Sequence, residues 1–296
     1  MAYFPNIEFS TMALNKKIIY VTGLPRAGST LLCQLLGHHP DIYSLGHSSP
    51  LSTLLESVRE HLSESPFHLS QLDVDFDLTY QRMVNASRGL LNGWFEETDS
   101  LFAVDKNRHW VSMIETLHIL DPDFKMLVCL RDLTEVYGSV EAAHDKTRML
   151  NFPDSTPYNH YFSRLEFLFK EDGVIGGPLR GIQNLQYITH DDIKDRICYI
   201  EFNALVHQPR EVMNTLFDWL DMPRFAFDPE RLKVKPHESD SYYRFKYPHK
   251  TRDRIAPPPP HAVPEQLKTE IYQRYAWFYQ TFYPEIYESL TREGVV

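Results

Sequence analysis

The sequence is poor in cysteine, with only Cys33, Cys129 and Cys198 among 296 residues. The three stand far apart in apolar stretches, and none belongs to a Cys-x-x-Cys pair. An odd number of widely spaced cysteines argues against a disulfide framework and does not match the ligand spacing of a zinc site. We therefore expect free thiols in a protein of a reducing compartment.

Positive charge is also scarce, because 30 lysines and arginines face 40 aspartates and glutamates, for a net charge of -10. Such a chain offers no broad face for a polyanion, which argues against nucleic acid as a partner. A local anion site is still compatible with this balance, because backbone N–H groups and a few arginines are enough to build one.

Long apolar runs are missing as well. No stretch approaches the 18 continuous apolar residues of a membrane-spanning helix, and the first residues lack the basic start and apolar run of a signal peptide. We expect a cytoplasmic protein that does not enter a membrane. The apolar fraction of 43% is sufficient for a sizeable core.

Apolar runs and helical spacing alternate along the chain, which predicts an α/β fold: a P-loop-like parallel sheet flanked by helices in three layers. We find no repeat or boundary and expect one domain over residues 1–296. Residues 145–190 and 235–263 show little periodicity and are interpreted as long functional loops, apart from one aromatic helix. The predicted strands are Lys17–Thr22, Leu101–Val104, Lys125–Leu130 and Ile197–Phe202, with a further short strand before Ser44. The predicted helices are Ser29–Leu36, Pro50–Glu60, Tyr80–Phe95, Trp110–Leu120, Leu133–Ala143, Tyr161–Phe169, Pro209–Leu220 and Pro264–Tyr283.

The loop between the first strand and the first helix reads GLPRAGST over residues 23–30. Its GxxxxG spacing is that of a Walker P-loop, which points backbone N–H groups at a phosphate. The Walker lysine is absent, because Ser29 stands in its place, and the positive charge is at Arg26 instead. This substitution disfavours a kinase or NTPase, which needs that lysine and a Mg²⁺ site. A tight turn without a ligand is the alternative interpretation.

This loop, together with HHPD at residues 38–41, resembles the 5′-phosphosulfate loop of PAPS-dependent sulfotransferases, especially the tyrosylprotein and bacterial small-molecule branches. The resemblance extends from about Lys17 to Arg254. It implies a sulfotransferase of secondary metabolism that uses PAPS, releases PAP and requires no metal. The loop residues that would bind the donor are Arg26, Ala27, Gly28, Ser29 and Thr30.

Two later segments strengthen the resemblance. A buried strand ends in Arg131-Asp132, and Ser139 follows inside the next helix, which implies that Arg131 and Ser139 hold the 3′-phosphate of the donor. A surface ion pair at the strand end is the alternative for Arg131-Asp132. The basic string at residues 247–254 resembles the late loop that closes over the nucleotide and suggests Lys250 and Arg252 as phosphate ligands, although a solvated charge run explains it almost as well.

Transfer of a sulfuryl group requires a base for the acceptor proton and a cation for the leaving oxygen. His47 is the first choice for the base, where the tyrosylprotein branch has a carboxylate. The reserves are His144, Asp145 and Glu56. Lys106 lies in a segment that resembles the one in which relatives carry a catalytic lysine. The resemblance implies that Lys106 shares with Arg26 the stabilisation of the leaving oxygen. A loop histidine and an ordinary surface lysine are the alternatives.

The acceptor is not specified by the sequence. The acidic balance favours a neutral or cationic small molecule, sulfated on a hydroxyl or an amine. The aromatic C-terminal helix packs either inside the protein or against a second copy in a homo-oligomer. Three rival functions stay open: a nucleotide-binding protein without transferase activity, a small-molecule kinase, and, weakest, a hydrolase with an elbow at residues 46–50 that lacks its final glycine.

Overall fold

A computed structural model describes residues 11–147, 161–234, 238–239, 248–249 and 251–296. Five parallel strands form one sheet in the order β2-β3-β1-β4-β5, which confirms the predicted α/β class. A two-stranded antiparallel pair, β6 with β7, lies outside this sheet. The strands are β1 (Lys17–Gly23), β2 (Ile42–Tyr43), β3 (Phe102–Lys106), β4 (Lys125–Leu130), β5 (Ile197–Glu201), β6 (Glu238–Ser239) and β7 (Pro248–His249).

The central strands β1 and β4 are buried on both faces. Every residue of β1 after Lys17 is buried, and so is every residue of β4 after Lys125. Successive side chains of a strand point to opposite faces of the sheet, so uninterrupted burial requires helices on both sides. The apolar runs that predicted these strands therefore also account for the three-layered arrangement.

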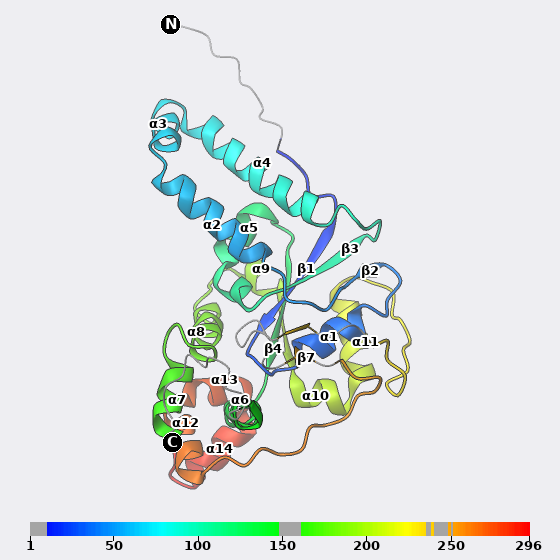
Figure 1. Cartoon of the computed structure of the whole chain (residues 1–296), viewed down its shortest axis with the longest axis vertical. Coiled ribbons are helices and arrows are strands. Elements are labelled where there is room, and N and C mark those ends of the chain that lie inside the picture. Colours follow the sequence, from blue (N-terminus) through cyan, green and yellow to red (C-terminus); the bar gives the residue numbers. More distant parts are fainter. Residues whose placement is uncertain (1–10, 148–160, 235–237, 240–247, 250) are drawn as a thin grey trace, which may run out of the picture.

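The helices form two groups beyond the sheet (Figure 1). Helices α2, α3 and α4 extend as an arm past one end, whereas α12, α13 and α14 gather beside α6 and α7 at the other. The helices are α1 (Ser29–Leu36), α2 (Leu51–Glu64), α3 (Pro66–Val74), α4 (Phe76–Trp94), the 3-10 helix η1 (Arg108–Ser112), α5 (Ile114–Leu120), α6 (Leu133–Thr147), α7 (Tyr161–Phe169), α8 (Gly176–Leu185), α9 (Asp191–Lys194), α10 (Phe202–His207), α11 (Pro209–Trp219), α12 (Glu265–Arg274), α13 (Ala276–Phe282) and α14 (Pro284–Arg292).

The structure corrects several predicted boundaries. The single helix expected at 110–120 is divided into η1 and α5, because the Asn107 side chain accepts from the N–H of His109 and starts a separate turn. The strand expected to reach Phe202 ends at Glu201, whose carboxylate caps α10 at the N–H of Ala204. The helix expected at 264–283 is two helices that meet at Tyr275, and α14 follows them.

The third strand is also longer than predicted: it runs to Lys106, so this lysine is part of the strand rather than of the loop after it. Val21 of β1 pairs with Lys106 in the parallel register. Because β1 runs parallel to both of its neighbours, β3 and β4, the loops that follow these three strands lie at the same edge of the sheet. In an α/β fold this edge, where the chain changes direction across the sheet, is where ligands bind.

Candidate active site

The loop after β1 is held tightly against β4. Gly23 has a φ of +118°, and a Cβ atom there would lie 2.2 Å from the carbonyl oxygen of Cys129. The next N–H, that of Leu24, donates to the same carbonyl at 3.0 Å. Gly28 has a φ of +85°, and a Cβ atom there would approach the Phe202 ring to 2.7 Å. Both glycines of the GxxxxG pattern are therefore required by close contacts as well as by conformation.

Helix α1 begins directly after this loop and carries no side-chain cap. Gly28 is its N-cap residue, and the first intrahelical bond runs from the N–H of Leu32 to the carbonyl of Gly28. The N–H groups of Ser29, Thr30 and Leu31 precede that bond and point out of the helix start. Exposed N–H groups and the positive end of the helix dipole form a binding site for an anion.

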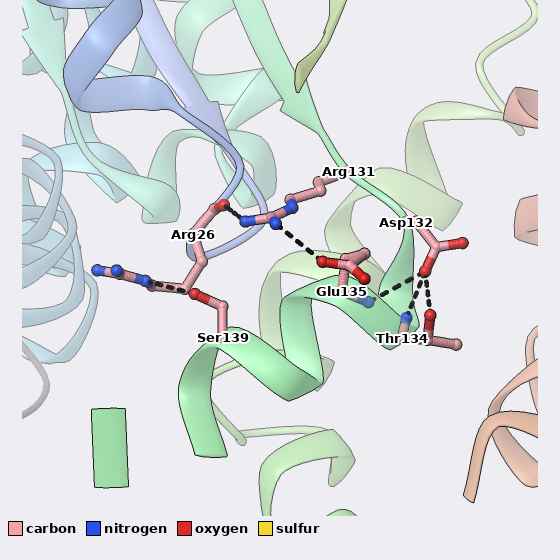
Figure 2. Close-up of polar contacts among 6 residues, drawn as sticks. All are labelled: Arg26, Arg131, Asp132, Thr134, Glu135 and Ser139. Carbon is pink, nitrogen blue, oxygen red and sulfur yellow. Dashed lines mark hydrogen bonds and ion pairs between the residues drawn. The ribbon is translucent and has the colours of Figure 1, made fainter. Parts of the chain in front are cut away.

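Arg26, Arg131 and Ser139 meet in front of this helix start (Figure 2). Arg26 Nε donates to Ser139 Oγ at 3.2 Å, and Arg131 Nη1 donates to the backbone carbonyl of Arg26 at 3.1 Å. Arg131 Nη2 bonds Glu135 Oε2 at 3.1 Å, and the guanidinium carbon lies 4.4 Å from the centre of the Phe202 ring. The structure thus brings Arg26 together with Arg131 and Ser139, which lie 105 and 113 positions later in the sequence.

The electrostatics of Arg131 favour an anion beside it. Burial lowers the pKa of Arg131, the charge of Arg26 lowers it further, and Glu135 acts in the opposite direction. The Nε atom of Arg131 is buried and has no hydrogen-bond partner among the described residues. A buried donor without a partner costs free energy, and two neighbouring guanidinium groups repel each other. An anion bound between them would relieve both costs.

Asp132 serves the helix rather than the anion site. Its Oδ1 accepts from the N–H of Thr134 at 2.8 Å and from the N–H of Glu135 at 3.0 Å, which caps the start of α6 (Figure 2). The cap fixes the first turn of α6, the helix that carries Glu135 and Ser139. The Arg-Asp pair at the strand end is therefore not a surface ion pair: each residue has its own partners.

Two cavities share the walls Arg26, Ser29 and Thr30. The first, here called the inner cavity, has a volume of about 290 Å³, and the second, called the strap cavity, about 340 Å³. The inner cavity is also bounded by Leu24, Pro25, Val21, Thr22, Ser48, Ser49, Pro50, Lys106, Asn107 and Arg108. The strap cavity lies between Arg131, Ser139, Phe202 and residues of the segment 251–263, here called the strap. The P-loop residues therefore stand between two adjoining hollows.

Lys106 lines the inner cavity and is 6% exposed. Its Nζ atom lies 3.2 Å from Thr30 Oγ1, so the lysine reaches the start of α1 from the end of β3. The neighbouring Asp105 is buried on the other face of the strand and accepts from Trp110 Nε1 at 2.6 Å. Burial raises the pKa of Asp105. Lys106 is therefore a buried cation beside the anion site, and not the surface lysine that the sequence left open.

The candidate bases lie outside the lining of the inner cavity. His47 is exposed, whereas the next three residues of its loop, 48–50, line the cavity. Glu56 Oε2 lies 2.8 Å from Nε2 of His109, a residue that is not among the predicted bases. His144 is buried and Asp145 is exposed on α6, and neither lines the described cavities.

The strap passes over α6 to complete the second cavity, and it is the orange segment that leads to α12 in Figure 1. Gln34 Nε2 donates to the carbonyl of Arg252 at 2.8 Å and to that of Lys233 at 2.8 Å, which ties α1 to this part of the chain. Arg252 and Arg254 both line the strap cavity. Arg254 was missed, although the basic string contains it, and Lys250 lies outside the described residues.

The strap crosses α6 at a glycine. A Cβ atom at Gly138 would lie 2.5 Å from the Cβ of His261 and 2.9 Å from a methyl group of Val263. The absence of a side chain at Gly138 therefore allows this close approach. Neighbouring Ser139 belongs to the same helical turn and points to Arg26 (Figure 2).

Two general features are absent from the part of the chain that the structure describes. No group of three or more histidine, cysteine, aspartate and glutamate side chains there is arranged to hold a metal ion. No helix within these ranges has the length and apolar character needed to cross a membrane.

The fold and the loop after β1 define an α/β protein with a P-loop-like turn that lacks the Walker lysine. Residues 19–227 match the sequence pattern of the sulfotransferase family, and the chain belongs to this family. An uncharacterized protein of Aquifex aeolicus (strain VF5) is 22% identical over 214 residues, which are 71% of this chain and 26% of that protein. The chain thus matches about a quarter of the length of this curated relative.

Solved structures with a similar course of the chain include two sulfotransferases. The sulfotransferase domain from the curacin biosynthetic pathway is 20% identical, with a TM-score of 0.46, and the match covers 73% of this chain and 77% of that domain. Sulfotransferase STF9 from Mycobacterium avium is 17% identical, with a TM-score of 0.44, and the match covers 92% of this chain and 78% of that protein.

Proposed function

We propose that this chain transfers a sulfuryl group from PAPS to a hydroxyl or amine of a small-molecule acceptor, as one domain acting in the cytoplasm. The observation that carries the proposal is the meeting of Arg26, Arg131 and Ser139 at the uncapped start of α1, beside the buried Lys106. Family membership supports sulfuryl transfer in general. The donor and the residue roles are inferred from the family resemblance together with this geometry, and the acceptor class from the acidic charge balance.

The residues present fit a nucleotide that carries two anionic groups. The helix start, with the N–H groups of residues 29–31 and the side chain of Arg26, would hold the 5′-phosphosulfate. Arg131 and Ser139 would hold the 3′-phosphate, because the unpartnered Nε of Arg131 offers a donor for it. Phe202 and the strap, with Arg252 and Arg254, would enclose the rest of the nucleotide. Lys250 is proposed as a further phosphate ligand on the sequence resemblance alone.

PAPS supplies an activated sulfuryl group whose transfer leaves PAP as the product, and no metal is required in this proposal. Lys106 Nζ and the Arg26 guanidinium, at the boundary between the two cavities, would stabilise the negative charge that develops on the leaving oxygen. The acceptor would occupy the inner cavity, from which it faces Lys106 and Thr30. Fixed cations that need no rearrangement are the main contribution that the protein makes to such a transfer.

Two imidazoles are proposed as alternatives for the base that removes the acceptor proton. His47 belongs to the loop that borders the inner cavity, and its role remains the prediction made from the sequence. His109 is supported by the Glu56 carboxylate, whose Oε2 lies 2.8 Å from Nε2 of the ring, an arrangement that fixes the orientation of the imidazole. His47→Ala and His109→Ala separate the two, because only loss of the true base removes the acidic limb of the pH dependence of kcat.

The first experiment is calorimetric titration of the protein with PAP in the absence of Mg²⁺. We expect micromolar binding, and we expect Arg131→Ala to weaken it at least about tenfold, since a hydrogen bond to a charged group contributes about 1.5–3 kcal/mol. Arg82→Ala, which removes an exposed arginine on the α2–α4 arm, is the control and should bind as the wild type does. Binding of ATP in place of PAP would support a kinase. PAP binding without turnover of any acceptor would support a binding protein.

A further inference from the structure

A groove follows α8 away from the inner cavity. Its near part is a hollow of about 530 Å³ that shares Asn107 and Arg108 with the inner cavity. Its far part is a hollow of about 630 Å³ that shares Ser112 and Asn184 with the near part. The three hollows therefore adjoin in series.

The spacing of the lining residues along α8 indicates that the near part and the far part belong to one groove. Helix α8 and the following turn contribute Gly177, Pro178, Arg180, Gly181 and Asn184 to the near part, and Asn184, Leu185, Tyr187 and Ile188 to the far part. Five of these residues, Gly177, Gly181, Asn184, Leu185 and Ile188, continue from one part into the other. Steps of four, three, one and three residues keep to one stripe of a helix. The opposite wall is η1 and α5, and α8 packs closely on η1, where a Cβ atom at Gly181 would lie 2.5 Å from Val111. A helix of ten residues is about 15 Å long, so the groove extends well beyond a small acceptor.

The chemical character changes along the groove. The near part has Gly173, Gly177 and Gly181 in its wall and contains Arg180, whose charge is balanced by Glu171 at 2.8 Å. The far part offers more apolar than polar surface, through Ile114, Ile119, Leu185, Tyr187, Ile188 and Ile193. Polar side chains, among them Glu115, His118 and His190, complete its wall. Ile119 and Tyr187 are 43% and 73% exposed, which leaves apolar surface for a ligand to cover.

We propose that the α8 groove binds the apolar tail of an elongated acceptor whose hydroxyl or amine head reaches Lys106 in the inner cavity. The inference rests on the proposed function for the identity of the head, and on the groove alone for the tail. The acceptor class is an amphiphile: a small polar head that is sulfated, followed by an alkyl or alkyl-aryl chain. Burial of each CH₂ group contributes to binding, so longer chains should be preferred up to the length of the groove.

The test compares 4-methylphenol, 4-butylphenol and 4-octylphenol as acceptors with PAPS as donor. We expect kcat/KM to rise with chain length, by up to about fourfold per buried CH₂. Asn184 is exposed where the two parts of the groove meet, so Asn184→Trp should obstruct the groove without disturbing the core. This variant should lose the advantage of 4-octylphenol and keep the activity on 4-methylphenol. Asn184→Ala, which leaves the groove open, should behave as the wild type.

Calorimetry with 4-octylphenol and with PAP separates this inference from the proposed function. A wild-type protein that binds PAP but gains nothing from the octyl chain, in turnover or in binding, overturns the groove proposal. Equal effects of Asn184→Trp on the short and long phenols also overturn it. Binding of 4-octylphenol that Asn184→Trp abolishes, in a protein that does not bind PAP, supports the groove and rejects the sulfotransferase function instead.

Discussion

At the scale of single residues, the contact that matters most for the proposed sulfuryl transfer is that between Lys106 and Thr30. The lysine is buried and ends a strand, so it cannot move away when the charge in front of it changes. We expect Lys106→Met to lower kcat by about 10²–10³-fold, the usual loss when one fixed donor to a developing negative charge is removed. The dissociation constant of PAP should change little, because the arginines hold the phosphates. A large loss of PAP affinity with normal kcat would assign Lys106 to binding.

Asp121 gives a residue-scale prediction about stability. Burial raises its pKa to about 6, and the Tyr20 hydroxyl donates to Oδ2 at 3.2 Å. Because the pKa is raised in the folded state, its contribution to stability is fully present below about pH 4 and is lost as the pH rises through 6. Asp121→Asn should therefore be more stable than the wild type by about 1–3 kcal/mol at pH 7, with the difference vanishing at pH 4. Urea unfolding at both pH values measures this, and a difference independent of pH would contradict it.

At the scale of elements, α6 and the strap must fit together at Gly138. Alanine raises helix propensity by about 1 kcal/mol over glycine, but here the added Cβ would meet His261 and Val263. We expect Gly138→Ala to displace the strap and weaken PAP binding several-fold, as measured by calorimetry, with α6 intact in the circular dichroism spectrum.

Gly93→Ala is the matched control for that variant. Gly93 also lies in a helix, α4, and a Cβ atom there would meet nothing within 4 Å. This substitution should be neutral or stabilising and should leave the affinity for PAP unchanged. Equal PAP affinity in the two alanine variants would show that the strap does not depend on the glycine.

The elements that could be predicted from the sequence are those whose own residues determine them. Strands β1 and β4 are uninterrupted apolar runs, and α1 starts after a glycine pattern, so each was placed correctly. Helix α8 was missed because its sequence, GGPLRGIQNL, is rich in helix breakers and depends on packing against η1. Helix α3 has no buried residue and gave no apolar period. It is held in the arm by its contacts with α2 and α4.

The candidate site could be predicted only where its residues belong to local sequence motifs. Arg26, Arg131 and Ser139 lie in motifs that local sequence reveals, and the structure brings them into contact. His109 and Arg254 escaped notice because their roles depend on partners distant in sequence: Glu56 on α2 for one, and the cavity under the strap for the other. Single-sequence reasoning has no means to find such pairs.

At the scale of the whole molecule, the proposed donor site joins the loop after β1 to the strap in the last third of the chain. A ligand that binds only the folded protein stabilises it, by about 2.7 kcal/mol when its concentration is 100 times its dissociation constant. We expect PAP at that concentration to raise Tm by roughly 4–5 °C, and EDTA to leave this shift unchanged. Scanning calorimetry measures both. A shift that EDTA abolishes would indicate a metal in the site.

The double tie from Gln34 to the carbonyls of Lys233 and Arg252 has a consequence for synthesis of the protein. Gln34 and Arg252 are 218 positions apart in the chain. At about 5–20 residues per second, the ribosome delivers the second partner roughly 10–40 s after the first. During that interval the nascent chain has its phosphate loop but no wall beneath which a nucleotide can be enclosed. We therefore expect binding of the proposed donor to be among the last properties that a newly made molecule acquires.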